Sequence, residues 1–272
     1  MRRRARAWDA AMLLLLAVWA TPFFWQLRTS FTPDAELLTT DRTLPAHPTL
    51  VHYRAVVERS VMPRALVNSL GVAALTTAVA VVLGLPAAYA LARLPVPGKG
   101  LLLLAVVAST AFPQITTVSP LYLLLRALGL RDTWTALVLV DTSFALPLVM
   151  WLLAGFIREI PIELEEVAFL DGAGRVAVLR RVIAPLVAPG VASAALVTFL
   201  AAWNEFLFAF TFTASEASRT VPVALALFPG VFEVPWGDIA AASILASLPP
   251  LVIVVVLQRW LVRGLVAGAL KE

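Results

Sequence analysis

Long apolar stretches separated by short charged segments run along the whole chain. Six of them approach or exceed the length of a membrane-spanning helix, which needs about 20 apolar residues. Only Asp141 and Glu205 interrupt a stretch with a charge. The pattern therefore predicts an all-α membrane protein, with a single transmembrane domain over residues 1–272. We place its six spans at about residues 10–27, 65–92, 100–125, 133–157, 186–212 and 239–258.

The composition agrees with this pattern and excludes several classes of protein. Hydrophobic residues make up 61% of the chain and charged residues 14%, whereas a soluble domain has about 25% charged residues. A soluble globular enzyme is thereby excluded. The chain has no cysteine, which excludes a disulfide scaffold, a thiolate metal site and a thiol nucleophile. Its two histidines, His47 and His52, are too few for a His-rich metal cluster.

The distribution of basic residues indicates how the chain is oriented. It starts with Arg2, Arg3, Arg4 and Arg6, and basic residues accumulate on the cytoplasmic side of membrane proteins. We expect both termini in the cytoplasm and the segments 28–64 and 213–238 outside. The apolar stretch 10–27 is not followed by an A-x-A cleavage site, so we interpret it as an uncleaved span. We therefore attribute the net charge of +4 to basic residues on the cytoplasmic side, next to membrane lipid. We expect no nucleic-acid partner.

The outside segments and several spans contain prolines. Pro33, Pro45, Pro48 and Pro63 predict that the segment 28–64 is mostly irregular. Proline removes a helical hydrogen bond and favours a kink. Prolines that punctuate the spans in this way include Pro86, Pro113, Pro120, Pro147, Pro249 and Pro250.

The inside loop between the fourth and fifth spans, residues 158–185, has a pattern of its own. Pro161 suits the first turn of a helix, and small residues from 171 to 174 predict a tight turn. In the first helix we expect Leu164, Val167 and Ala168 on one face and the acids Glu163, Glu165 and Glu166 around the other sides. In the second helix we expect a stripe of Val176, Leu179 and Ile183.

Two interpretations of this loop remain open on the pattern alone. It could be a surface helix that lies on lipid headgroups. However, its first half is acidic, and anionic lipid repels acidic helices. An acidic loop of small residues is more typical of a docking element for a protein partner.

The residues of this loop resemble the EAA loop of bacterial ABC-importer permeases. The matching segments are Glu166-Val167-Ala168, Asp171-Gly172-Ala173 and Val182-Ile183-Ala184-Pro185, at the spacing of that motif. Val167, Val182 and Ala184 depart from its usual residues but keep their size or polarity. Segments 202–206, 219–224 and 264–271, together with Asn68-Ser69, are similar to the second permease of maltose-type sugar importers.

This resemblance implies a type I ABC-importer permease fold, in which the EAA loop is a coupling helix seated on a cytoplasmic ATPase. We call residues 158–185 the coupling loop. The residues that would couple to the ATPase are Glu166, Ala168, Asp171, Gly172, Ala173 and Pro185. A side chain at Gly172 would hold the two helices apart or strain the turn. The resemblance also implies a docking role for Gly268, Ala269 and Lys271, unless the C-terminus is simply frayed.

Polar residues inside the spans are candidates for the translocation path, because burying them in a bilayer is costly. Asp141 and Glu205 lie in the outer halves of spans that run in opposite directions, so they could share one depth. Each acid could instead be protonated, paired or exposed to a watery vestibule. The hydroxyls of span three could instead join helices to one another. The full set of candidates is Gln114, Thr117, Asp141, Asn204 and Glu205.

The resemblance implies an inner-membrane permease that forms half of the path for a sugar, delivered by an extracytoplasmic binding protein. A second permease and an ATPase dimer would complete the importer. The spans contain no lysine or arginine to hold an anion, which favours a neutral substrate. The alternative is a permease for glycerol-3-phosphate or related polyol phosphates, and a passive channel is a distant alternative.

The chain itself is not expected to be an enzyme or to bind a cofactor. Its Gly98-Lys99-Gly100 segment lacks the glycine spacing and the Ser/Thr of a nucleotide-binding P-loop. ATP and Mg would therefore be bound by the separate ATPase.

Overall fold

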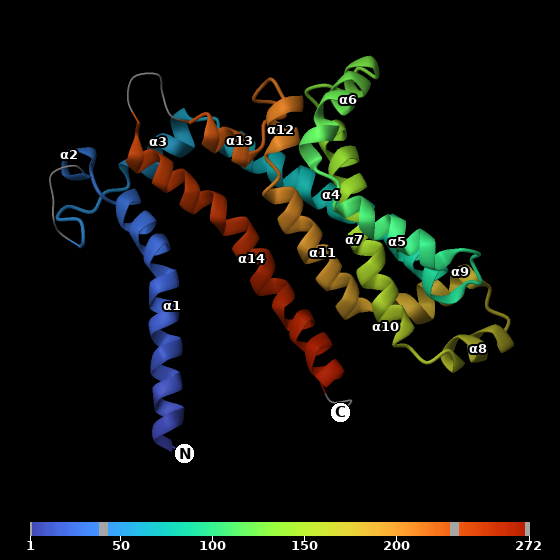
Figure 1. Cartoon of the computed structure of the whole chain (residues 1–272). Coiled ribbons are helices and arrows are strands. Elements are labelled where there is room, and N and C mark those ends of the chain that lie inside the picture. The colour runs from blue at the N-terminus through green and yellow to red at the C-terminus, as the bar shows by residue number, and fades with distance from the viewer. Residues whose placement is uncertain (1, 38–42, 229–233, 270–272) are drawn as a thin grey trace. The chain divides into compact units, whose positions relative to one another are not determined.

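The computed structural model describes residues 2–37, 43–228 and 234–269, and these residues form helices and connecting segments without a strand (Figure 1). The chain divides into two compact units, one of Met1–Pro63 and Ala224–Leu248 and one of Arg64–Val223 and Pro249–Glu272. The helices are α1 (Arg2–Ser30), α2 (Asp34–Leu37), α3 (Val51–Arg59), α4 (Met62–Arg93), α5 (Lys99–Thr110), α6 (Gln114–Ala127), α7 (Trp134–Arg158), α8 (Glu163–Leu170), α9 (Arg175–Val178), the π-helical η1 (Leu179–Ile183), α10 (Ala184–Leu186), α11 (Ala188–Trp203), α12 (Leu207–Phe212), α13 (Val221–Ala226) and α14 (Trp236–Ala269).

Each of the six predicted spans is mostly helical. By length and composition, α4, α7 and residues Trp236–Gln258 of α14 could cross a membrane. The segment Arg175–Leu186 and α11, bent by 79° at their junction, would count as a fourth span if taken together. The first, third and fifth predicted spans correspond to α1, to α5 with α6, and to α11 with α12.

Two of the predicted spans are broken into separate helices. The third breaks between α5 and α6 at Pro113, which has an extended backbone (φ −63°, ψ 119°) and lacks the N–H that a continuous helix needs. The fifth breaks between α11 and α12, where residues 204–206 leave the helix. Helices α4, α6, α7 and α14 instead continue through their prolines, which are Pro86, Pro120, Pro147, Pro249 and Pro250.

The prediction that residues 28–64 are mostly irregular is wrong. Helix α1 continues to Ser30, and α2 and α3 follow within this segment. The prolines lie outside α3: Pro48 precedes it, and Pro63 is the second residue of α4, where a missing N–H costs no helical bond.

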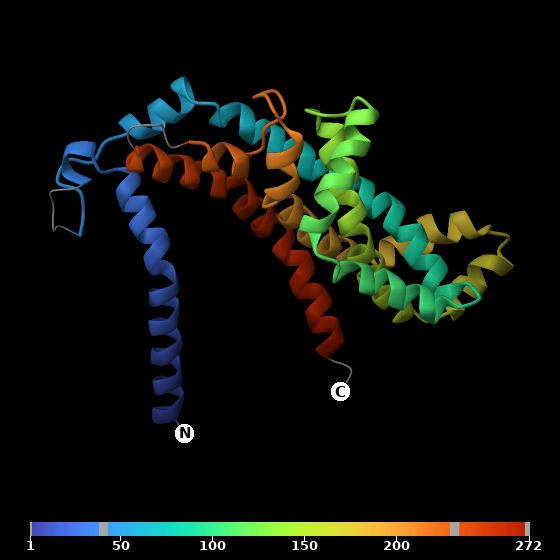
Figure 2. The same cartoon turned by 45° about the horizontal axis from the view of Figure 1, so that its top comes forward.

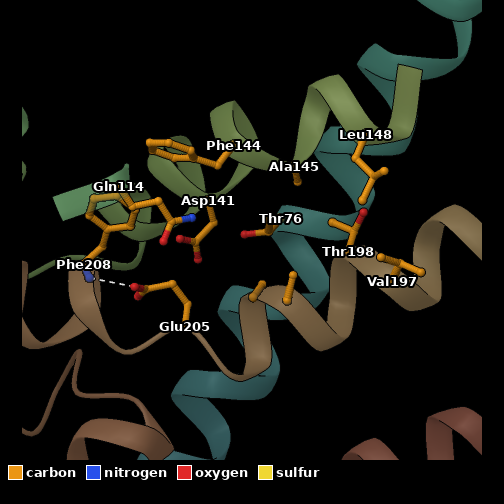
Figure 3. Close-up of a pocket in the computed structure, with 12 residues that line it drawn as sticks. Thr76, Gln114, Asp141, Phe144, Ala145, Leu148, Val197, Thr198, Glu205 and Phe208 are labelled. Carbon is orange, nitrogen blue, oxygen red and sulfur yellow. Dashed lines mark hydrogen bonds between the residues drawn. The ribbon is translucent and has the colours of Figure 1, made fainter. Parts of the chain in front are cut away.

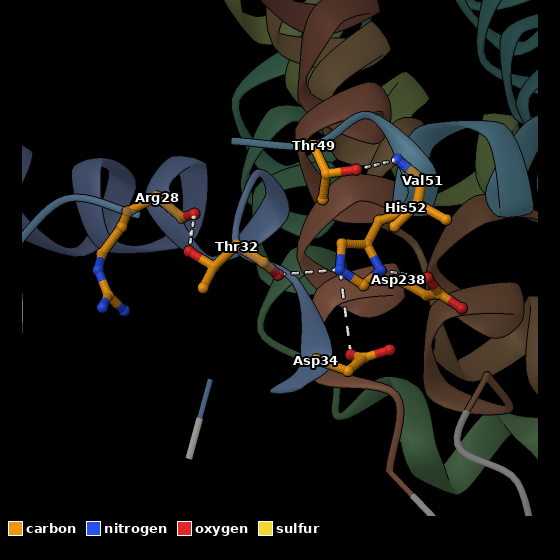
Figure 4. Close-up of polar contacts among 7 residues, drawn as sticks. All are labelled: Arg28, Thr32, Asp34, Thr49, Val51, His52 and Asp238. Atoms are coloured by element: carbon orange, nitrogen blue, oxygen red, sulfur yellow. Dashed lines mark hydrogen bonds and ion pairs between the residues drawn. The ribbon is translucent and has the colours of Figure 1, made fainter. Parts of the chain in front are cut away.

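A buried histidine joins the separate parts of the first unit (Figure 4). His52 of α3 is 2% exposed. Its Nδ1 lies 2.7 Å from Asp238 Oδ1 at the start of α14, and its Nε2 lies 3.0 Å from the carbonyl oxygen of Thr32. A side chain at Gly237 would collide with this ring, because its Cβ would lie 2.2 Å from Cε1 of His52. The histidine thus stabilises α3 against both neighbouring segments.

Among the described residues of the second unit, two apolar cores lie along α4 and α7. One contains Val72, Leu137, Phe208 and Phe212, and involves α4, α6, α7 and α12. The other contains Tyr89, Leu153, Ile157 and Ile183, and extends into the coupling loop. Figure 2 shows α8 and α9 gathered at one end of α4 and α7. The second core therefore anchors the coupling loop to the ends of the long helices.

Candidate translocation pocket and coupling loop

A pocket of about 140 Å³ lies inside the second unit (Figure 3). Its walls come from α4, α6, α7, α11 and α12, and many of them are apolar side chains such as Phe144, Leu148 and Phe208. None of the described residues that line it is a lysine or an arginine. The polar lining residues are Thr76, Gln114, Asp141, Thr198 and Glu205.

Two buried polar atoms at this pocket have no hydrogen-bond partner among the described residues. They are Oδ1 of Asp141, whose residue is 8% exposed, and Oγ1 of Thr76, whose residue is fully buried. Most buried polar atoms in proteins are paired with protein or with water. The pocket therefore offers an acceptor and a hydroxyl that a bound water or a ligand hydroxyl could satisfy.

Glu205 has a second role beside lining the pocket. Its Oε1 accepts from the N–H of Phe208 at 2.7 Å, and its Oε2 accepts from the N–H of Ala209 at 2.8 Å. The first N–H groups of a helix have no partner within it, so the break before α12 leaves these two groups for the carboxylate. Glu205 is thus held in place at the pocket wall as the cap of α12.

The other two path candidates do not line the pocket. Asn204 is exposed, and its side-chain N–H donates to the carbonyl of Leu200. The hydroxyl of Thr117 donates to the carbonyl of Gln114. Such local bonds are the usual fate of short polar side chains in helices. The structure thus brings together Gln114, Asp141 and Glu205 of the five candidates.

Sequence reasoning missed Thr76 and Thr198, which line the same pocket. Each is a hydroxyl in an otherwise apolar stretch. That signal is weak, because a hydroxyl in a spanning helix commonly bonds to its own backbone.

The coupling loop forms two short helical segments around a tight turn, as predicted. Gly172 has φ +81°, in the left-handed region that favours glycine. The N–H of Ala173 donates to the carbonyl of Ala168 at 3.0 Å and closes the end of α8. A Cβ at Gly172 would meet no atom within 4 Å. The turn therefore needs glycine for its backbone angle. Of the two expected effects of a side chain, strain in the turn is confirmed, whereas a collision that holds the helices apart is not.

The predicted coupling residues divide into two groups. Glu166, Asp171, Gly172 and Pro185 are exposed. Ala168 and Ala173 are partly buried against the second apolar core. The first group is available for contact with another molecule, whereas the two alanines pack the loop onto its own chain.

The sequence pattern of α8 does not indicate which face points inward, and the structure places the acid Glu165 there. Glu165 is 2% exposed, while Leu164 and Val167 are 45% and 57% exposed. The acid points inward because Tyr89 and Arg93 of α4 bind its carboxylate. The loop consequently exposes a set of large apolar side chains: Ile162, Leu164, Val167, Phe169, Leu170 and Val176. Exposed apolar patches of this kind mark interaction surfaces.

The predicted stripe of the second helical segment is also partly wrong. Val178 and Ile183 are fully buried, whereas Val176 is 69% exposed. The reason is the π-helical turn η1, in which hydrogen bonds span five residues rather than four. It places residues five apart, such as 178 and 183, on one face.

Two segments that resemble sugar permeases meet at the loop after α12. The side-chain N–H of Asn68 donates to the carbonyls of Glu216 and Arg219, at 3.0 and 2.8 Å. The hydroxyl of Ser69 accepts from the N–H of Val221 at 2.8 Å. The start of α4 thus fixes the loop that leads into α13.

Asp132 binds the same loop from the residues before α7. Its carboxylate accepts from the N–H groups of Ala214 and Ser215, at 2.8 and 3.0 Å, and from the hydroxyls of Ser215 and Ser218. Burial alone would raise the pKa of Asp132, but these hydrogen bonds outweigh it and hold that pKa well below its usual value. Sequence reasoning did not single out this residue.

The candidates for C-terminal docking lie at the limit of the described chain. Gly268 and Ala269 are the last two residues of α14. Lys271 lies outside the described residues, so its predicted role stays a prediction.

Comparison with known proteins agrees with this architecture. The chain is 43% identical over 271 residues to the trehalose transport system permease protein SugB of Mycobacterium tuberculosis, covering 99% of this chain and 98% of that protein. It is 39% identical over 262 residues to the sulfoquinovosyl glycerol transport system permease protein SmoH of Agrobacterium fabrum, covering 96% and 92%.

A solved structure shares the fold. It is a crystal structure of a bacterial ABC transporter involved in the import of the acidic polysaccharide alginate, and a chain of it matches with a TM-score of 0.80 at 20% identity, over 93% of this chain and 96% of that chain. Residues 80–267 match the family model of the binding-protein-dependent transport system inner membrane component. The chain therefore belongs to this family of inner-membrane components, and it is a non-catalytic permease subunit of an ABC importer.

Proposed function

We propose that this permease forms half of the translocation path for a neutral sugar, which an extracytoplasmic binding protein delivers. A second permease subunit completes the path, and an ATPase dimer docks on the coupling loop and binds the ATP and Mg. The chain itself then carries no cofactor. In this arrangement both of its termini lie in the cytoplasm.

The observation that carries the proposal is the set of polar side chains in the pocket between α4, α6, α7, α11 and α12. The pocket presents the carboxylates of Asp141 and Glu205 and the hydroxyls of Thr76 and Thr198, with no cation among the described lining residues. Sugar hydroxyls are donors, and the unpaired oxygen of Asp141 is an acceptor. A phosphate needs cationic partners, and none of the described residues that line the pocket is a lysine or an arginine. The pocket therefore favours a neutral polyhydroxy compound.

The surface of the coupling loop supports docking to a protein. Glu166, Asp171 and Gly172 are exposed beside the apolar side chains of Leu164, Phe169 and Leu170. Interfaces between proteins combine apolar residues with a polar rim in this way. Ala168 and Ala173 contribute by holding the turn against the core. Gly268, Ala269 and Lys271 are a second, smaller contact in this proposal.

The test is uptake of radiolabelled compounds by cells that lack this chain. The panel contains neutral mono- and disaccharides, sulfonated glycosides and polyol phosphates. We expect uptake of one neutral sugar to be lost and to return when the chain is supplied again. Loss of a phosphorylated or sulfonated compound alone would contradict the substrate class, and unchanged uptake of every compound would contradict the function.

A further inference from the structure

Arg93, the last residue of α4, lies at the meeting point of three segments. Its Nε donates to Glu165 Oε1 of α8 at 2.5 Å, and its Nη2 donates to the carbonyl oxygen of Ile160 at 2.5 Å. Ile160 lies two residues after the end of α7. One guanidinium thus connects the ends of two long helices with the first helix of the coupling loop.

Tyr89 completes the contact from one turn earlier in α4. Its hydroxyl donates to Glu165 Oε2 at 2.8 Å. Residues four apart on a helix lie on the same face, so Tyr89 and Arg93 reach the carboxylate together. Both oxygens of Glu165 are therefore bound by side chains of α4.

This ion pair is buried, unlike the other charged side chains of α8. The side chains of Arg93 and Glu165 are 11% and 3% exposed, whereas Glu163 and Glu166 are exposed. Removing charges from water is costly, and the cost is offset only when geometry and hydrogen bonding are good. Apolar residues would attach the helix without directional bonds, so the polar pairing fixes one orientation of α8 on α4.

We propose that Arg93, Glu165 and Tyr89 tie the coupling helix to α4, so that α4 and α8 move as one rigid piece during transport. This inference rests on the proposed docking of an ATPase to the coupling loop. Displacement of α8 then carries α4 with it, and α4 lines the pocket through Thr76. Arg93 and Glu165 are positioning residues: they act on the pocket through α4 and do not contact the substrate.

The test measures two rates in the complete importer, reconstituted in proteoliposomes with its binding protein. One rate is uptake of the labelled sugar and the other is ATP hydrolysis. In Glu165→Gln and Arg93→Gln we expect hydrolysis to continue while the sugar transported per ATP falls roughly tenfold, a typical size for coupling between sites. Arg93→Lys keeps the ion pair and should restore most of that ratio.

The controls are Arg126→Gln and Glu216→Gln, which change exposed charges outside the coupling loop and should leave the ratio unchanged. Glu165→Gln keeps the shape of the side chain and can still form neutral hydrogen bonds. It therefore tests the proposal even if the importer does not assemble with Arg93→Gln. If uptake and hydrolysis fall in equal proportion, or if the ratio stays at the wild-type value, the proposal is overturned. A wild-type complex that hydrolyses ATP but moves no sugar would instead contradict the proposed function.

Discussion

Gly172 shows how a single backbone angle shapes the coupling loop. Its φ of +81° lies where a residue with a Cβ is strained, although there is open space around it. Gly172→Ala should therefore destabilise the turn by roughly 1–2 kcal/mol and reduce uptake. Gly172→Asn should have a smaller effect, because asparagine tolerates this region better. Labelled uptake and the thermal midpoint of the purified protein measure both effects.

The matched control is Gly174→Ala, two residues away. Gly174 has φ −75° and also has open space for a Cβ, so alanine should fit there without loss. Equal effects at the two glycines would show that the backbone angle is not what makes Gly172 necessary.

Asp132 predicts a pH dependence of stability. Its pKa is lowered in the folded protein, so its contribution is fully present above the unfolded pKa of about 3.9 and is lost as the pH falls below that value. Asp132→Asn should lower the free energy of unfolding at pH 7 by roughly 1–3 kcal/mol. The difference from the wild type should shrink on acidification from about pH 5 toward pH 3. Thermal unfolding in detergent across this range measures it.

The control for Asp132 is Glu216→Gln, an exposed carboxylate in the loop that Asp132 binds. It should change stability little at any pH. A gap between Asp132→Asn and the wild type that stays constant down to pH 3 would contradict the assigned role.

At the residue scale, sequence predicts the chemistry better than the direction in which a side chain points. Gln114, Asp141 and Glu205 stand out because polar groups are rare in the spans, and they do line the pocket. The burial of Glu165 could not be predicted, because periodicity sorts residues by polarity alone. Its burial depends on Arg93, more than 70 positions away in the chain, and no local pattern carries that information.

At the scale of elements, the apolar pattern predicts where the helices lie. It predicts the breaks within the spans only in part. The break at Pro113 follows from a missing N–H. The break at residues 204–206 has no proline and depends on Glu205 capping α12. The π turn η1 is likewise set by packing: it brings Val178 and Ile183 into the same core.

The pocket between these elements yields a direct prediction. Ala145 of α7 lines it, so Ala145→Phe should fill the space and reduce uptake at least tenfold. We expect roughly 1–3 kcal/mol of destabilisation from overpacking, which a thermal midpoint would report separately. The matched control is Leu139→Phe on the same helix, where the side chain is 52% exposed. Wild-type uptake by Ala145→Phe would show that substrate does not pass this pocket.

At the scale of the whole molecule, the scarcity of charges predicts a membrane protein, and the coupling loop identifies its class. Family membership confirms the permease fold. The partners could be inferred only from the resemblance of residues 166–185 to a known motif, because a docking surface in a single chain does not identify what covers it. The exposed apolar side chains of α8 agree with a protein partner.

The central claim is that this chain is the permease of an ATP-driven sugar importer. The most direct measurement is uptake of the labelled neutral sugar into proteoliposomes that contain the complete complex. Uptake is compared with and without ATP on the side of the membrane where the ATPase lies. We predict accumulation above the outside concentration only when ATP and the binding protein are both present. Equilibration of the sugar at the same rate without ATP would contradict this account and would indicate a passive channel.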